Sequence, residues 1–394
     1  MENRALNTQS AIHIKLLVLL SVFLFWFSHY VYMPTLPQYI RIKVSTLTQV
    51  GIVLSMYGIW QVVVRLPIGL ITDRAGKRKP FIILGISFAG IGALVLGFSE
   101  SFLVLAIGRS LVGISMSAWV LQVVFFGRLF EPSELIKASS ILTLSTSLAK
   151  LAGTISTGYL NNLGGYLLAF QVASFGALLS VLFMIPVKET RIPYSGEGNF
   201  NLNLMLKNRK VIVVSLLAGI NQFLNFGITF GFFPLVAQEF GASDIVKSHL
   251  LGFNIIFLIS GNLLVTYFGK QKNSILLLLI SYLFFSFSVT LIPQAGTIGI
   301  LFILQAILGL AHGISYPVLI SLCIGDIPEQ NRSSVMGFHQ SIYAVGMFLG
   351  PWICGMIADG LGLYQSFTIV GIGTFILSFS LLYFLRRSTR ISNM

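Results

Sequence analysis

The sequence contains few charged residues for its length. Only 9% of its 394 residues are Asp, Glu, Lys or Arg, while 55% are hydrophobic; a typical soluble domain has about 25% charged residues. The mean hydropathy is +0.88, so the apolar residues exceed what the core of a soluble protein could bury. This composition excludes a soluble enzyme, an intrinsically disordered chain and a nucleic-acid-binding domain, and it predicts a membrane protein.

Cysteine and clustered polar chemistry are also scarce. Cys323 and Cys354 lie apart inside apolar stretches and show none of the spacings typical of disulfide frameworks or zinc sites. The sequence has no carboxylate, His or Cys cluster near one membrane face and no GxxxxGK[ST] loop, so we expect neither an enzyme nor an ATP-driven pump, and no metal or cofactor. No cleavable signal peptide is expected, because the apolar stretch after Lys15 is long enough to span and no small-residue cleavage site follows it.

Long apolar runs divide the chain. A bilayer-spanning helix needs about 20 mostly apolar residues, and the sequence contains twelve such runs. They lie near residues 16–36, 48–70, 80–98, 102–126, 138–160, 166–186, 211–236, 249–266, 274–292, 298–322, 333–357 and 365–385. We therefore expect an all-α membrane protein of twelve transmembrane helices in two pseudo-symmetric six-helix bundles. The bundles comprise residues 1–186 and 211–394, and the polar stretch 187–210 is the linker between them.

The basic residues are distributed unevenly between the loops. If both termini face the cytoplasm, 19 of the 25 Lys and Arg residues fall inside, three (Arg41, Lys43 and Lys247) fall outside, and three lie within spans. The positive-inside rule favours this orientation, so we expect a multi-pass inner-membrane protein with both termini and the linker in the cytoplasm. The formal net charge of +13 is then mostly a consequence of topology and does not indicate a nucleic-acid partner.

The two halves of the chain share a pattern of small and polar residues. The matches have offsets of 196 to 200 residues: Gly153, Gly158 and Gly165 with Gly350, Gly355 and Gly362, Arg109 and Gly113 with Gln305 and Gly309, and Pro34 with Pro234. Any one match is weak, because small residues are common in membrane helices. Three matches at nearly one offset, with a linker at the midpoint, indicate a duplicated six-helix unit of the kind from which many transporters are built.

A patterned loop joins the second and third spans, where residues 69–80 read GLITDRAGKRKP. A basic cytoplasmic loop would explain the lysines and arginines but not an acid and two glycines at these spacings. We expect Gly69 and Gly76 to allow a close helix approach and a tight turn. The loop resembles the signature of the major facilitator superfamily, G-x-x-x-D-R-x-G-R/K-R/K, and the matching residues are Gly69, Asp73, Arg74, Gly76, Lys77 and Arg78.

This resemblance covers the whole chain, because the number of spans, the linker and the repeat all agree with it. It implies a secondary transporter that works as a monomer. It also implies that Asp73 is a gating residue, which helps to latch the two halves together in the outward-facing state and does not bind substrate. The region from span one into span two looks like bacterial drug and metabolite efflux members of the superfamily.

Ionisable residues inside the spans are the first candidates for a functional site, because each costs at least ~2.5–3.5 kcal/mol to insert. Arg109 and Gly113 in span four are similar to the superfamily's R-x-x-x-G pattern, which is associated with proton coupling. Span five, which carries Lys150, lacks the proline of the antiporter signature. No Asp or Glu lies deep within a span, so His29 and His312 are alternative proton carriers. A lysine paired across helices and a histidine bonded to a neighbouring helix are the structural alternatives.

By resemblance, spans one, four, seven and ten line the substrate cavity. The candidate coupling and substrate-binding residues are Arg109, Lys150, His29, Tyr32, Asn225, Gln305, His312 and Tyr316. Arg109 and Lys150, two cations deep within the spans and without an anion at that depth, favour an anionic or amphipathic substrate. We therefore expect proton-coupled efflux of a small organic solute by alternating access, with the substrate, protons and the lipid bilayer as partners. A proton-coupled importer of an organic anion or sugar is the alternative.

Overall fold

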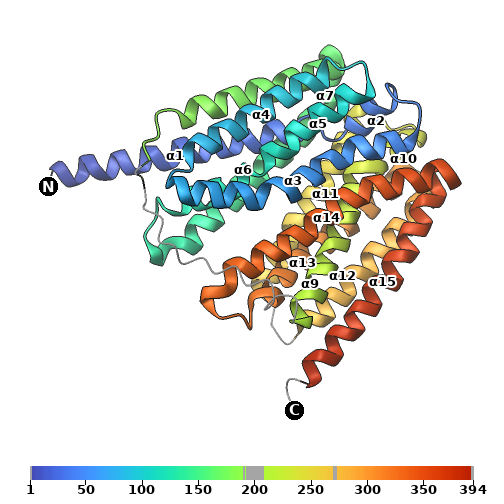
Figure 1. The fold of residues 1–394 in the computed structure, drawn as a ribbon. Helices are drawn as coiled ribbons and strands as arrows, with labels where there is room; N and C mark the ends of the chain where they lie inside the picture. The colour runs from blue at the N-terminus through green and yellow to red at the C-terminus, as the bar shows by residue number, and fades with distance from the viewer. Residues whose placement is uncertain (1, 190, 192–207, 269–272, 392–394) are drawn as a thin grey trace. The chain divides into compact units, whose positions relative to one another are not determined.

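The computed structural model describes residues 2–189, 191, 208–268 and 273–391. Every regular element in these ranges is a helix (Figure 1). The chain divides into two compact units, which we call the first unit (Met1–Pro34 with Val63–Gly196) and the second unit (Thr35–Val62 with Glu197–Met394). Most of the expected linker lies outside the described residues.

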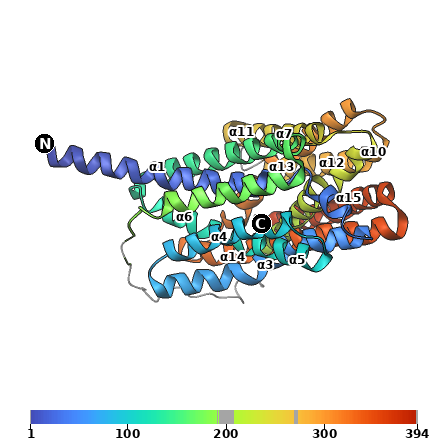
Figure 2. The same ribbon diagram turned by 90° about the horizontal axis from the view of Figure 1, so that it is seen from above.

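The first unit is a bundle built around α1 and α7. It contains α1 (Glu2–Tyr30), the second half of α3 (Leu47–Ala75), α4 (Lys79–Gly97), α5 (Phe102–Met116), α6 (Ala118–Gly127), the 3-10 turn η1 (Pro132–Glu134) and α7 (Leu135–Met184). Helix α1 packs mainly against α7, and α4 packs against both α5 and α7. Figures 1 and 2 show α1 running alongside α7 in both views.

The second unit has the same kind of bundle with an additional short helix. It contains α2 (Leu36–Arg41), the first half of α3, α9 (Arg209–Phe223), the π-helix η2 (Leu224–Phe232), α10 (Phe233–Glu239), α11 (Asp244–Phe268), α12 (Ser274–Leu291), the 3-10 turn η4 (Ile292–Gln294), α13 (Ile298–Ile324), α14 (Glu329–Leu361) and α15 (Leu363–Ile391). Helix α11 packs on α13, α14 packs on α9, and α12 packs on α15.

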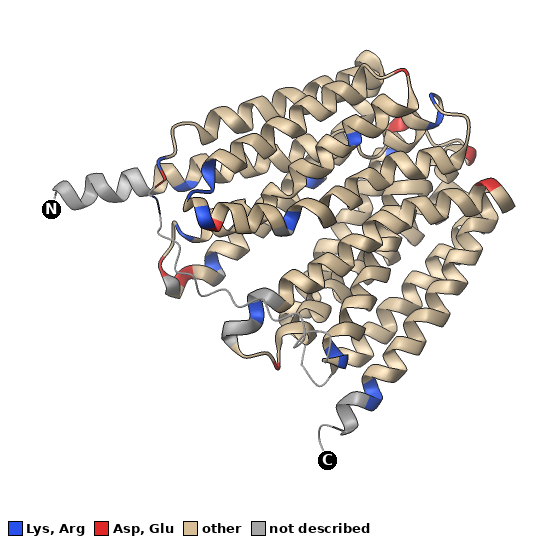
Figure 3. Cartoon of the chain, in the orientation of Figure 1, with Lys and Arg blue, Asp and Glu red and all other residues tan. Residues whose placement is uncertain are grey.

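The twelve predicted spans are confirmed once one long helix is divided. Among the described residues, eleven helical segments are long and apolar enough to cross a membrane, and one of them, Lys137–Met184, is 48 residues long. That segment is interrupted at Gly164 and Gly165, where the backbone is not helical. It therefore supplies the fifth and sixth spans. Figure 3 shows that charged residues gather mainly near the ends of the long helices, as expected for segments that cross lipid.

The sequence repeat corresponds to a repeated backbone geometry. Gly165 and Gly362, which are 197 residues apart, both have positive φ, 67° and 102°, a conformation that glycine adopts without a Cβ clash. Each lies where one span ends and the next begins. Gly153 and Gly350 share a second property: an added Cβ would meet a backbone oxygen of a neighbouring helix at 2.9 Å and 2.5 Å respectively. Both halves therefore use glycine at matched positions to break a helix and to bring two helices close together.

The first and seventh spans are irregular at matched positions. Helix α1 ends at Tyr30, and a turn containing Pro34 leads to α2. In the second unit, η2 is wound as a π-helix and Pro234 lies at the start of α10. Proline cannot donate the helical hydrogen bond, and π-helical segments occur frequently at functional sites. The regular α-helical hydrogen bonding is therefore interrupted at matched positions in the first and seventh spans.

Helix α3 contributes to both units. Its first turn is held in the second unit by Asp359 of α14, whose two carboxylate oxygens accept the N–H groups of Leu47 and Thr48 at 2.7 Å each. About two turns further along α3, the Ser55 hydroxyl donates to the Phe348 carbonyl at 2.6 Å. The residues that follow Val62 group with the first unit. The division into 1–186 and 211–394 stays a prediction, and the compact units differ from it by the exchange of residues 35–62.

Candidate polar sites and the transporter family

A cationic side chain meets aromatic rings in the first unit where α1, α6 and α7 come together. The Lys150 Nζ lies 4.0 Å from the centre of the Trp26 ring and 5.6 Å from that of the Tyr30 ring. Trp26 also makes an edge-type contact with Trp119, with ring centres 5.1 Å apart. Among the described residues, no carboxylate or other acceptor pairs with the Lys150 ammonium, which is placed over ring faces instead. We call Lys150, Trp26, Tyr30 and Trp119 the aromatic–lysine cluster.

Arg109 is more deeply buried than Lys150. Its side chain is 1% exposed, its Nη2 lies 3.8 Å from the Met33 Sδ, and it interacts with the Tyr32 side chain. Lys150, by contrast, is only partly buried. The two cations predicted from the sequence therefore have different surroundings: Arg109 is packed against the turn that follows α1, and Lys150 lies at a partly open aromatic surface.

His29 uses both of its ring nitrogens. Its Nδ1 lies 2.8 Å from the Phe25 carbonyl oxygen and its Nε2 lies 3.4 Å from the Ser115 hydroxyl. Because a carbonyl oxygen can only accept, Nδ1 carries the proton, and in the neutral ring Nε2 accepts from the serine. A proton carried by His29 would therefore be added at Nε2, on the side of Ser115.

The polar residues of the second unit are mostly neutral. Gln305 is fully buried, and neither of its amide atoms has a hydrogen-bond partner among the described residues. The Asn221 amide donates to the Ser315 hydroxyl at 2.5 Å. His312 and Tyr316 have nearly parallel rings, with an angle of 7° and ring centres 6.2 Å apart. Asn225 lies in the π-helix and is partly exposed.

The second unit also contains a buried lysine, which is paired. Lys247 is 1% exposed. Its Nζ lies 2.7 Å from an Asp244 carboxylate oxygen and 2.6 Å from the Gln238 side-chain oxygen. The topology assignment placed Lys247 in an outer loop, whereas the structure places it in the first turn of α11. Its charge is balanced locally, so it does not require an external anion.

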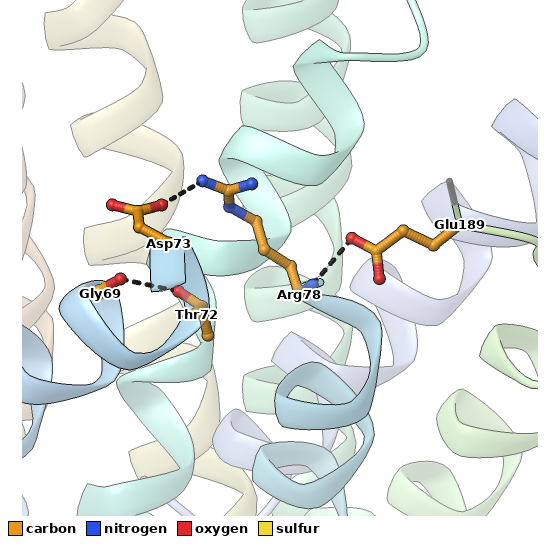
Figure 4. A network of polar contacts seen from close by, with 5 residues as sticks. All are labelled: Gly69, Thr72, Asp73, Arg78 and Glu189. Carbon is orange, nitrogen blue, oxygen red and sulfur yellow. Dashed lines mark hydrogen bonds and ion pairs between the residues drawn. The ribbon is translucent and has the colours of Figure 1, made fainter. Parts of the chain in front are cut away.

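The signature loop forms a compact ion-pair and capping network (Figure 4). The Arg78 guanidinium donates to Asp73 at 2.5 Å. The Thr72 hydroxyl donates to the Gly69 carbonyl at 2.9 Å. Gly76 has a φ of 67°, which confirms the tight turn. The expected close approach at Gly69 is absent, because an added Cβ there would meet nothing within 4 Å in the described structure.

Glu189, which the sequence did not single out, completes this network. Its carboxylate accepts the backbone N–H groups of Arg78 and Lys79 at 2.8 Å each and so caps the N-terminus of α4, whose own N-cap residue supplies no side-chain bond. The pKa of Arg128 is lowered, mainly because burial disfavours its charge and next because Arg78 is nearby. The charges of Glu189 and Asp73 act in the opposite direction and raise this pKa. Two bases and two acids therefore interact at this end of the first unit.

The helical architecture and the loop agree with a comparison across protein families. The Major Facilitator Superfamily model matches residues 18–223 and 215–393, which together cover nearly the whole chain. The chain belongs to the Major Facilitator Superfamily. It is a multi-pass membrane transporter, and the superfamily's function is the movement of small solutes.

Relatives within the superfamily are distant. An uncharacterized MFS-type transporter of Methanocaldococcus jannaschii is 23% identical over 362 residues, covering 87% of this chain and 92% of the relative. The bacillibactin exporter of Bacillus subtilis is 23% identical over 334 residues, covering 81% and 83%. A solved POT family transporter in complex with 5-aminolevulinic acid superposes with a TM-score of 0.79 at 15% identity, covering 95% and 96%. The likeness to this solved structure shows the shared fold.

Within this superfamily fold, the candidate residues fall into separate groups. In the first unit, Lys150 and His29 both lie beside Trp26, with the Trp26 and His29 ring centres 6.5 Å apart. In the second unit, His312 and Tyr316 are in contact. Trp119 lies in one of the spans expected to line the cavity but was not among the predicted site residues, although the chain has only four tryptophans. Glu189 could have been noticed as an acid that directly follows span six and Lys188.

Proposed function

We propose that this superfamily member is a secondary active transporter that exports a small organic anion or amphipathic solute by alternating access, in exchange for protons. The observation that carries the proposal is Lys150, a lysine within a transmembrane span that has aromatic rings but no described carboxylate beside it. Such a cation is costly in the bilayer, and a bound anion would compensate it. The bacillibactin exporter among the relatives supports the outward direction.

Arg109 and His29 are the residues that we assign to proton coupling. Arg109 is buried beside Tyr32 and Met33 and lies in the R-x-x-x-G pattern. His29 has a ring nitrogen facing Ser115 that can take up a proton.

The experiment that tests the proposal is solute accumulation by proteoliposomes under an imposed pH gradient. The panel is benzenesulfonate as an organic anion that stays ionised, glucose as a sugar and ethidium as a cationic drug. An exchanger accumulates benzenesulfonate when the lumen is acidic, because protons leave as the solute enters. A symporter accumulates it when the outside is acidic, whatever the orientation of the protein in the vesicle.

Accumulation of benzenesulfonate with an acidic lumen is the expected result. Accumulation with an acidic exterior, or of glucose alone, would favour the alternative, a proton-coupled importer of an organic anion or sugar. Equal uptake in both gradients would contradict proton coupling. No uptake of any of the three solutes, from protein that remains folded in the vesicles, would contradict the proposal itself.

Asp73 is proposed to set the balance between inward-facing and outward-facing states through its bond to Arg78. The variant Asp73→Asn weakens that ion pair while keeping the shape of the side chain. We expect it to change the accessibility of single cysteines placed at opposite ends of the spans and to slow transport. Unchanged accessibility and unchanged transport would contradict this gating role.

We also infer that the protein works as a monomer in the inner membrane with both termini in the cytoplasm. The uneven distribution of Lys and Arg supports this orientation. A C-terminal fusion to a fluorescent protein that matures only in the cytoplasm should be bright, and a fusion to a periplasmic phosphatase should be inactive. The reverse pattern would overturn the orientation.

A further inference from the structure

Two buried polar side chains without a described hydrogen-bond partner are found at the aromatic–lysine cluster: Trp26, which belongs to it, and Gln122, which lies on the same helix as Trp119. Trp26 is 8% exposed and Gln122 is 2% exposed. Neither the Trp26 Nε1 nor either amide atom of Gln122 has a hydrogen-bond partner among the described residues. Gln122 lies three residues after Trp119 on α6, less than one helical turn away. Buried polar groups without partners are rare in native proteins and call for an explanation.

These groups are suited to one kind of ligand atom. The Lys150 ammonium, the Trp26 indole N–H and the Gln122 amide all donate hydrogen bonds, and only the Gln122 carbonyl accepts. A carboxylate has two oxygens that accept several hydrogen bonds and carries the charge that Lys150 lacks beside it. A cationic ligand would be repelled by the Lys150 ammonium, and a neutral sugar would leave the ammonium without a counter-charge.

The rings around the lysine add a second requirement. Trp119 is partly exposed, although it contacts Trp26 at 5.1 Å between ring centres. From these distances, the Lys150 Nζ is at most about 9 Å from the Trp119 ring. Aromatic pairs prefer offset-stacked or edge-to-face geometry and gain beyond the area that they bury. A planar aromatic ring on the exposed part of Trp119 could therefore carry a carboxylate that reaches Lys150.

The repeat offers an internal comparison. At the offsets of 197, 196 and 200 residues, the second unit has Met347 in place of Lys150, Ser315 in place of Trp119 and Phe226 in place of Trp26. The cation, the second tryptophan and the indole N–H are all missing there. The cluster is therefore not required by the duplicated helix packing, because α9, η2, α13 and α14 pack together in the second unit without it.

We infer that Lys150, Trp26, Trp119 and Gln122 form a subsite for an aromatic carboxylate, and that the transported solute carries this group. The inference rests on the proposed function and narrows its substrate from organic anions in general to aryl carboxylates. Lys150, Trp26 and Gln122 contact the carboxylate, and Trp119 covers the ring.

The test is equilibrium binding to the purified full-length protein in detergent. Binding is measured by calorimetry and by the quenching of tryptophan fluorescence. The probes are benzoate, cyclohexanecarboxylate (the same charge on a non-planar ring) and benzyl alcohol (the same ring without the charge). We expect benzoate to bind at least about tenfold more tightly than either of the others, equivalent to about 1.4 kcal/mol. Equal affinity for benzoate and cyclohexanecarboxylate would overturn the aromatic requirement, and equal affinity for benzyl alcohol would overturn the carboxylate requirement.

Variants locate the site. Lys150→Met installs the residue of the second unit and should weaken benzoate binding at least about tenfold, whereas Lys150→Arg should restore most of it. Lys137→Met is the matched control on the same helix, because Lys137 is 65% exposed and pairs with Glu134 at the surface; it should bind as the parent does. If Lys150→Met does not fold, Trp119→Leu provides the test and should remove the preference for benzoate over cyclohexanecarboxylate. Unchanged binding by Lys150→Met or an unchanged preference in Trp119→Leu would overturn the subsite.

The failure of this inference can be told apart from the failure of the proposed function. If the protein accumulates benzenesulfonate in proteoliposomes but does not prefer benzoate in detergent, the transporter proposal stands and the subsite is overturned. Protein that binds benzoate through Lys150 but moves neither benzoate nor any of the panel solutes would keep the subsite as a binding site and overturn the transport proposal.

Discussion

The two units share a backbone plan but differ in the chemistry of matched positions. Gly165 and Gly362 break the helix in the same way in each unit, and Ser101 and Thr297, 196 residues apart, each cap the helix that follows. At the same offset, however, the first unit has Arg109 where the second has Gln305. Both side chains are fully buried. The duplicated framework therefore does not dictate polarity, and we propose that the asymmetry serves transport.

The buried lysines show the same contrast more sharply. Lys247 in the second unit has Asp244 and Gln238 as partners, whereas Lys150 in the first unit lies over Trp26 and Tyr30. A paired lysine is part of the structure, since removing its partner leaves a buried charge. A lysine held only by ring faces is available to an anion that arrives from outside. Charge balance within the protein therefore separates structural lysines from candidate ligand-binding ones.

The largest expected effect concerns Lys247, the lysine that has a carboxylate partner. Asp244→Asn leaves Lys247 buried with only neutral partners, which should cost about 3 kcal/mol and lower the apparent Tm by roughly 5 °C. Lys150→Met removes a cation that has no described counter-ion, so it should leave the Tm unchanged or raise it. Thermal unfolding of the two variants in the same detergent measures both. A large loss of stability in Lys150→Met would show that its charge is structural.

A smaller effect is expected at the matched pair of Arg109 and Gln305. Arg109→Gln gives the first unit the residue of the second and should lower accumulation driven by the pH gradient about tenfold, since the charge in this position is assigned to coupling. Gln305→Leu removes an amide that has no described partner and should lower accumulation less than about threefold. Ser110→Ala is the control on α5, because among the described residues the Ser110 hydroxyl donates to the Ala106 carbonyl of its own helix. Similar losses of accumulation in Arg109→Gln and Gln305→Leu would contradict the proposed functional difference between the two units.

The smallest effects are expected where the units are alike. Glu189 in the first unit and Asp359 in the second each accept two backbone N–H groups at the start of a helix. Glu189→Gln and Asp359→Asn each replace one acceptor oxygen by a donor and should cost about 1 kcal/mol. Amide hydrogen exchange should accelerate about fivefold at residues 78–79 in the first variant and at residues 47–48 in the second. Acceleration at both places in either variant would show that the two caps are coupled.

Much of the architecture could be predicted from the sequence because the bilayer imposes it. The number of spans follows from the lengths of the apolar runs, and the repeat is visible in glycines that the structure places at matched turns. The pairing of Asp73 with Arg78 was accessible because both lie in one loop. The break between the fifth and sixth spans was also visible, since glycines interrupt the apolar pattern there.

The candidate sites could be predicted only in part from the sequence. Arg109 and Lys150 were found because a charge inside a span is conspicuous, but their different surroundings were not. Trp119 and Gln122 are ordinary residues of an apolar run, and their importance depends on which face of α6 meets α1. Glu189 falls within the predicted linker, and its carboxylate accepts N–H groups of residues 111 and 110 positions earlier in the chain.

The sequence alone determined a membrane transporter of twelve spans, its internal duplication and its signature loop. These properties depend on the composition of single segments and on spacing along the chain. The tertiary structure alone decided that Gln238 of α10 accepts from Lys247 and that Lys150 of α7 lies over the Trp26 and Tyr30 rings of α1. A helix carries its residues around its axis every 3.6 positions, so the rotation and crossing of neighbouring helices decide which side chains meet. No spacing along one helix contains that information.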